Sequence, residues 1–284
     1  MIYSPWLSKA AGFSFSMTEI DRRDTNDGLC RELWGQRIMR KNTDLNQVKA
    51  LAKTFLMLDI EQTEASPLVV HHPFTDSGIS VSQDRNGELK PVNLLEDEKA
   101  LRTWRQRMGE QIDKAGSAFH IHMMVTKPYR MTFLKHAKPF LSKAEFSEIL
   151  SDAWMCSESP GFDPNVSQRE QLAMFRAADP AALMDADEYE RLCSFEDPVT
   201  IYRGVTSYNA DHVKALSWTL NYDTVVWFAN RFDETGMIYE AQIAKDHILA
   251  YLNGRNEQEV IVDPRYLMEI SEAHKLDSGL SLSL

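Results

Sequence analysis

Cysteine is scarce in this chain of 284 residues, which contains three: Cys30, Cys156 and Cys193. They lie far apart, no two have the spacing of metal ligands, and an odd number suits a disulfide framework poorly. No apolar run reaches the length of about 18 residues that a transmembrane helix needs. The N-terminal stretch MIYSPWLSKAAGFSFSM is too interrupted by Ser and Lys for a signal peptide. We therefore expect a cytoplasmic protein in a reducing environment, with no membrane partner.

An excess of basic residues is also missing. The chain has 31 Lys and Arg against 42 Asp and Glu, which gives a formal net charge of -11. Binding to nucleic acid without sequence preference needs basic side chains that neutralise phosphates, so we expect no direct nucleic-acid partner. An acidic surface suits a basic protein partner and also serves solubility alone. The hydrophobic share of 43% is that of a globular protein with a sizeable core.

The first part of the chain, residues 1–130, is predicted to be mainly helical, and its sequence does not indicate a role. Apolar residues recur at helical spacing, and a continuous apolar run is interpreted as a buried strand. The predicted elements are a helix over 42–63, a short strand within 66–78, a helix over 93–116 and a buried strand over 119–125. On that last strand His120 and His122 would share one face.

Residues 131–284 are predicted to form a second domain. Its lead-in, 131–196, contains the capping-box sequences SKAE (142–145) and SQRE (167–170), each of which predicts a helix start. The core, 197–275, is rich in short β-type runs, which together with the helices indicate an α+β fold on a split antiparallel sheet. Strands are predicted at 199–205, 214–220, 236–243, 247–252 and 257–262, and a helix capped by Asn221 is predicted over 221–232.

Two predicted strands of this core carry polar residues that need an explanation. Arg203 follows Ile201 and Tyr202 on an inner strand, where its charge requires a phosphate or carboxylate partner, or else an edge position with the head in water. On the next strand, alternation puts the hydroxyls of Ser217 and Thr219 on one face. Two hydroxyls on one face can hold a carboxylate or a ribose, although such residues are also ordinary in strands.

A pair of glutamates opens the last predicted strand. Glu257 and Glu259 would share a face if the strand begins at Glu257. Like charges so placed are unfavourable, and an active site in which two carboxylates divide the labour is one reason to keep them. A charged loop end before the strand is the alternative.

In their order and spacing, the stretches YRG (202–204), SWT (217–219) and EQE (257–259) resemble the arginine-type mono-ADP-ribosyltransferases. The resemblance covers residues 197–263 and leaves residues 1–130 unexplained. It implies a transferase of the glycosyltransferase type that uses NAD as a substrate and needs no metal. The Trp in the middle of SWT departs from the smaller residues usual in the family, and we expect this side chain to pack into the core.

The resemblance also implies roles for single residues that bind NAD. Arg203 would hold NAD through its phosphate and ribose, and Gly204 would offer backbone groups to the nicotinamide amide. Ser217 would steady the catalytic glutamate, Glu259, while Thr219 would support the fold of the strand.

The acceptor side of the site follows from the same resemblance. Glu257 would orient and deprotonate the acceptor, and a glutamate at this position implies an arginine on a protein. The preceding loop, 249–256, would recognise the acceptor, with Tyr251 as its aromatic contact.

Other interpretations stay open. Water could replace the protein acceptor, which would make the protein an NAD glycohydrolase, or the fold could serve as a non-catalytic binding or structural module. His120 and His122 lack a second histidine motif, so we interpret them as core histidines rather than metal ligands. The helical region joined to this domain also resembles proteins of phages and mobile elements, which implies a host-cell acceptor or delivery of the protein with a virion. Toxin, antidefence and regulatory roles are equally compatible with the sequence.

Overall fold

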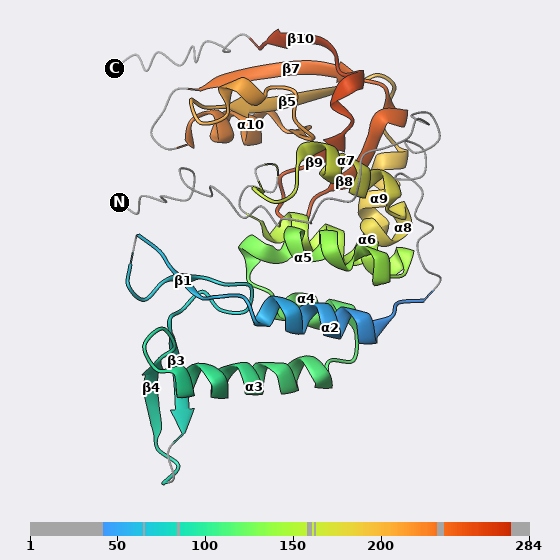
Figure 1. Ribbon diagram of the computed structural model, residues 1–284. Helices are drawn as coiled ribbons and strands as arrows, with labels where there is room; N and C mark the ends of the chain where they lie inside the picture. The colour runs from blue at the N-terminus through green and yellow to red at the C-terminus, as the bar shows by residue number, and fades with distance from the viewer. Residues whose placement is uncertain are drawn as a thin grey trace, which may run out of the picture. The chain divides into compact units, whose positions relative to one another are not determined.

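The structure is a computed structural model that describes residues 42–64, 66–83, 86–157, 161, 163–231 and 236–273 (Figure 1). Its residues form two compact units: unit 1 comprises the described part of 42–149 with 163–166, and unit 2 comprises 150–157, 161, 167–231 and 236–273. Both helices and antiparallel sheets are present, so the fold class is α+β. Cys30 lies outside the described residues. No helix in the described part of the chain is long and apolar enough to cross a membrane.

The two units divide inside helix α6 (Lys143–Cys156), between Ile149 and Leu150. The sequence had placed this boundary at residue 130. A helix that continues through the division leaves no break in composition or periodicity there, so the sequence pattern has nothing to mark the change.

Unit 1 is built around helix α2 (Leu45–Leu56), which buries Val48, Ala52 and Leu56 and packs against α3, α4 and α5. The buried residues recur every four positions, as expected for a core-facing stripe. Asp44 caps this helix by accepting a hydrogen bond from the backbone N–H of Gln47. The other elements of unit 1 are β1 (Glu61–Gln62), β2 (Val70–His71), β3 (Ile79–Gln83), β4 (Leu89–Asn93), α3 (Glu98–Lys114), α4 (Ala118–Met124), η1 (Lys127–Tyr129), α5 (Arg130–Ala137) and η2 (Lys138–Phe140).

The prediction of a buried strand over 119–125 is wrong, because this segment forms helix α4. The side chain of Ser117 caps the start of this helix by accepting from the N–H of His120. The apolar run that follows Ser117 had been interpreted without this cap. The carboxylate of Glu145, distant in sequence, accepts from the N–H groups of Ala118 and Phe119. In the helix His122 is buried and His120 is exposed, so the expected shared face does not exist either.

The segment predicted as a helical lead-in, 131–196, does contain helices, although its part up to Ile149 belongs to unit 1. Helices α7 (Gln168–Ala177), α8 (Pro180–Leu183) and α9 (Ala186–Cys193) precede the sheet of unit 2. The predicted capping box at Ser167 and Glu170 forms in full. At the start of α6 one of the two hydrogen bonds of the predicted capping box forms: the Ser142 side chain accepts from the N–H of Glu145. The Glu145 side chain instead caps α4.

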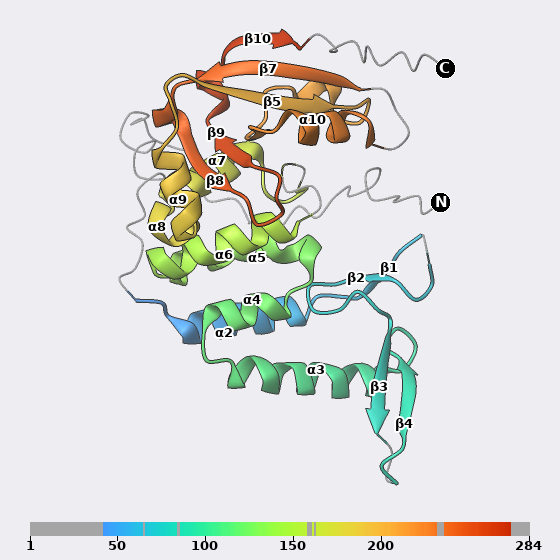
Figure 2. The same cartoon turned by 180° about the vertical axis from the view of Figure 1, so that it is seen from behind.

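Unit 2 contains an antiparallel six-stranded sheet in the order β10-β7-β5-β6-β9-β8. Helix α10 (Tyr222–Ala229) lies along β5, and α8 and α9 pack against β8 (Figures 1 and 2). The strands are β5 (Val199–Val205), β6 (Ser217–Thr219), β7 (Met237–Ile243), β8 (Ile248–Leu252), β9 (Glu259–Val262) and β10 (Met268–Glu272). Short 3-10 helices, labelled η, lie between them: η4 (Ala210–His212), η6 (Lys245–His247) and η7 (Pro264–Tyr266).

Strands β5 and β6 are joined by fewer register pairs than any other neighbouring strands of this sheet. Strand β5 pairs with β7 along its whole length but meets β6 at a single register pair, Tyr202 with Thr219. Beyond that pair the two antiparallel strands part, with Gly204 on one side and Ser217 on the other. The gap opens the sheet at the point where the sequence motifs lie.

Candidate functional site

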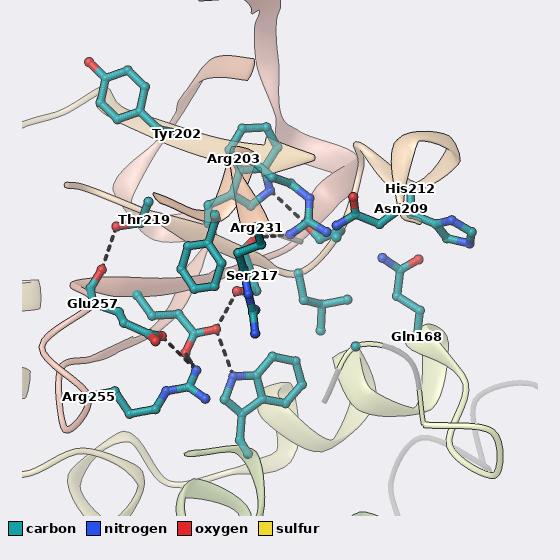
Figure 3. A pocket seen from close by; sticks show the side chains of 18 residues that line it. Gln168, Tyr202, Arg203, Asn209, His212, Ser217, Thr219, Arg231, Arg255 and Glu257 are labelled. Atoms are coloured by element: carbon teal, nitrogen blue, oxygen red, sulfur yellow. Dashed lines mark hydrogen bonds and ion pairs between the residues drawn. The ribbon is translucent and has the colours of Figure 1, made fainter. Parts of the chain in front are cut away.

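The pocket of unit 2 lies where β5 and β6 part, and it has a volume of about 350 Å³ (Figure 3). That volume is in the lower part of the range for small-molecule sites. Its lining comes from both parting strands, from the start of β9, and from helices α6, α7 and α10. The lining residues with polar or aromatic side chains are Trp154, Gln168, Tyr202, Arg203, Asn209, His212, Ser217, Trp218, Thr219, Phe228, Arg231, Arg255, Glu257 and Glu259.

Arg203 crosses the gap between the two parting strands. Its Nη1 donates to the carbonyl oxygen of Ser217 at 2.6 Å, so a side chain takes the place of a backbone ladder bond. The Nε atom is buried and has no hydrogen-bond partner among the described residues. Burial lowers the pKa of Arg203 to about 10, against the attraction of Glu259. A guanidinium that donates to a carbonyl and keeps a buried N–H unused retains the capacity to bind an anion.

Glu259 is the buried carboxylate of the pocket, with 4% of its surface exposed. Its Oε1 accepts from Ser217 Oγ at 2.5 Å and from the indole Nε1 of Trp154 at 3.0 Å. The register of β6 and β9 sets Thr219 opposite Glu259, so Ser217 reaches the carboxylate from the same face. Burial raises the pKa of Glu259, and the bonds from Ser217 and Trp154 oppose that rise. The two donors fix one oxygen, and Oε2 remains for other contacts.

Glu257 lies in the turn before β9 rather than on the strand, so the alternative of a charged loop end holds and the two glutamates do not share a strand face. Positive φ angles at Asn256 (60°) and Gln258 (48°) flank it, and such values are uncommon for residues other than glycine. Thr219 holds the turn in place, because its Oγ1 donates to the Glu257 carbonyl at 2.6 Å. The turn delivers the Glu257 side chain to the pocket by a different route from the predicted one.

Thr219 and Gly204 connect the pocket to helix α10. The Oγ1 of Thr219 also accepts from the N–H of Asn221, the residue that caps α10 as predicted. A Cβ atom on Gly204 would lie 2.7 Å from backbone atoms of both Val225 and Ala229. Glycine is therefore required here for the close approach of α10 to β5, in addition to any role toward a ligand.

The structure brings together Arg203, Gly204, Ser217, Thr219, Glu257 and Glu259, which all line the pocket. Trp218, between the two hydroxyls, is 2% exposed and packs into the core as expected. Tyr251 is the exception. It belongs to β8, it is 6% exposed, and its ring packs edge-on against Phe195. The expectation that Tyr251 contacts an acceptor is wrong, because β8 extends through this residue and buries its side chain.

Two further residues of the site were not assigned to it from the sequence. Trp154 donates to Glu259 from helix α6. Arg255 lies in the expected recognition loop, and its guanidinium points toward Glu257 (Figure 3). The signal for Arg255 was its position two residues before the first glutamate. Trp154 had no such signal, since 105 positions separate it from Glu259.

Among the described residues, no group of three or more His, Cys, Asp or Glu side chains could hold a metal ion. Comparisons of this chain with family models, with curated proteins and with solved structures find no match. Inferences about function therefore rest on the motifs and the geometry of the pocket.

Proposed function

We propose that unit 2 is the catalytic domain of a mono-ADP-ribosyltransferase that transfers ADP-ribose from NAD to an arginine side chain of a protein, with release of nicotinamide. The observation that carries the proposal is the convergence of Arg203, Ser217, Glu257 and Glu259 in one pocket. These residues come from three separate stretches of sequence, and each has the chemical character that the reaction needs. The single pair that joins β5 and β6 also suits the split sheet of such domains.

NAD complements the charges of this pocket. Its pyrophosphate is an anion that the guanidinium of Arg203, which lines the pocket, can bind. The pocket also offers the exposed backbone edge at Gly204 and the ring of Phe228 to a flat amide-bearing ring. The NAD molecule is a substrate here, and the pocket residues named above would hold it.

Cleavage breaks the bond between C1′ of the ribose and the nicotinamide nitrogen. The bonding electrons leave with nicotinamide, which becomes neutral, and positive charge develops on the ribose. A fixed carboxylate stabilises such an oxocarbenium-like centre, and Glu259 is the buried, hydrogen-bonded carboxylate available for it. A guanidinium nitrogen of the acceptor then bonds to C1′ as it loses a proton to Glu257, which is half-buried at the pocket edge.

The test is nicotinamide release from NAD together with transfer of labelled ADP-ribose to an arginine-rich protein or to agmatine, a small guanidine acceptor. Wild-type protein is expected to do both. Glu259→Gln keeps the size of the side chain and is expected to slow release by about 10²–10³-fold. Glu272→Gln, at an exposed position of β10, is the matched control and should behave as wild type.

The alternatives have distinct outcomes in the same assay. Release of nicotinamide that is not accompanied by transfer to any guanidine acceptor would indicate a glycohydrolase. If NAD is neither cleaved nor bound, the proposal fails and a non-catalytic module takes its place.

A further inference from the structure

Arg255 occupies the space between the two glutamates of the pocket. Its Nη2 lies 2.9 Å from Oε2 of Glu257 and 3.4 Å from Oε2 of Glu259. The Oε2 atom of Glu259 is the oxygen that Ser217 and Trp154 leave available. The Nη2 atom of Arg255 therefore faces both carboxylates of the pocket at once.

The backbone around Arg255 directs its side chain back into the pocket. The N–H of Asn256 donates to the carbonyl of Asn253 at 2.7 Å, and the side chain of Asn253 accepts from the N–H of Gln258 at 3.0 Å. These bonds close a tight turn over 253–258, so Arg255 and Glu257 face each other. The Nη1 atom makes longer contacts, at 3.4 and 3.3 Å, with the carbonyl oxygens of Met155 and Ser157.

The position of Arg255 meets the requirements of an acceptor. A guanidinium is a poor nucleophile until a base takes a proton from it, and Nη2 already lies within hydrogen-bond distance of the Glu257 carboxylate. The same nitrogen lies beside the carboxylate that faces the developing ribosyl cation in the proposed reaction. Because Arg255 belongs to the same chain as the pocket, no separate acceptor molecule has to bind first. This favours reaction when the group is well oriented.

We propose that Arg255 is itself an ADP-ribosylation site, modified within its own chain; this inference rests on the proposed function of the pocket. The bond between C1′ and nicotinamide breaks, nicotinamide leaves with the electron pair, and Nη2 of Arg255 forms the new bond to C1′. The proton lost from Nη2 passes to Glu257 and then to solvent. The products are neutral nicotinamide, one proton and a chain that carries one ADP-ribosyl group on Arg255, whose guanidinium keeps its positive charge.

The experiment uses the full chain as purified, incubated with NAD alone. Intact-mass measurement follows the addition of ADP-ribosyl groups, and fragmentation of peptides locates them. The expected result is one group per chain on Arg255, with a first-order rate that does not change when the protein is diluted tenfold. Arg255→Lys is expected to remove this modification. The matched control is Arg102→Lys, which changes an exposed arginine that also pairs with a glutamate, Glu98 at 3.1 Å, and should leave the modification intact.

The failure of this inference differs from the failure of the proposed function. If the protein releases nicotinamide and labels agmatine while Arg255 stays unmodified, the inference is overturned and the proposed function stands. The same holds if the modification rate scales with protein concentration or if the group is found only on other residues. If neither agmatine nor the protein is labelled and no nicotinamide appears, the proposed function itself has failed. Localisation on the wild-type chain decides the question even if Arg255→Lys folds poorly.

Discussion

Replacement of Trp154 by phenylalanine tests whether the indole N–H stabilises the buried carboxylate. Trp154 is 0% exposed, donates to Glu259 at 3.0 Å, and packs edge-on against Phe175 at 4.9 Å. A hydrogen bond to a charged group contributes about 1.5–3 kcal/mol, and the smaller ring leaves a gap that costs about 1–2 kcal/mol. We therefore expect Trp154→Phe to lower the free energy of unfolding by about 2.5–5 kcal/mol.

The same change has a second, electrostatic consequence. The bond from Trp154 opposes the rise that burial causes in the pKa of Glu259, so its loss should raise that pKa further. The acid limb of nicotinamide release should then move to higher pH, because the carboxylate must be ionised to stabilise a ribosyl cation. Carboxylate ¹³C NMR on glutamate-labelled protein follows this pKa without relying on activity.

Urea unfolding and the NMR titration together decide the matter. Trp227→Phe is the matched control, since Trp227 is 59% exposed on α10, and its loss should change stability by about 0.5 kcal/mol or less. If Trp154→Phe were no more destabilising than this control and left the Glu259 titration where it was, the reasoning about this hydrogen bond would be refuted.

Three further perturbations follow from the structure. Gly204→Ala should lower stability by about 1–3 kcal/mol in urea, because its Cβ would overlap backbone atoms of α10, whereas Gly116→Ala, which meets nothing within 4 Å, should not. Since burial raises the folded-state pKa of Glu259, the contribution of this group to stability should fall as pH rises above about 4.5. Relative to wild type, Glu259→Gln should therefore be more stable at pH 8 than at pH 4.5; equal differences at both pH values would contradict this. Burial lowers the pKa of His72 to about 4, so protonation of the unfolded chain should reduce stability as pH falls from about 6.5 toward 4, by up to about 3 kcal/mol. His72→Asn, whose side-chain oxygen can still accept from the N–H of Phe74, should show a flatter pH dependence; an unchanged slope would point to another group.

The sequence predicted the elements whose signals are local. Asn221 and Ser167 each satisfy backbone donors two or three positions away, so the starts of α10 and α7 could be read from a few residues. The strand predicted over 119–125 is wrong because the signal that decides its structure is not entirely local. A short apolar run does not distinguish a strand from a helix, and one of the two caps that settle the matter, Glu145, lies far along the chain.

The candidate site could be predicted to the extent that strand alternation defines it. Ser217 and Thr219 share a face because strands have a period of two, and the register of β6 with β9 brings Glu259 to that face. Glu257 departs from this pattern because the chain turns through positive φ at Gln258 before β9 begins. Such a turn has no clear marker in a glutamine, so the route by which Glu257 enters the pocket could not be predicted.

The charged groups Arg203 and Glu259, at the two ends of the pocket, suit a single ligand that contacts both. Glu259 is buried and Arg203 is half-buried. Arg203 donates to a carbonyl, whereas Glu259 accepts from a hydroxyl and an indole and lies 3.4 Å from Arg255. Burial lowers the pKa of the guanidinium and raises that of the carboxylate, because it disfavours the charged form of each group. A direct ion pair between them would satisfy both and would leave no room for a substrate. Under the proposed function, the pyrophosphate of NAD would pair with Arg203. The ribose that becomes cationic in the transition state would add to the contacts that Ser217, Trp154 and Arg255 make with Glu259.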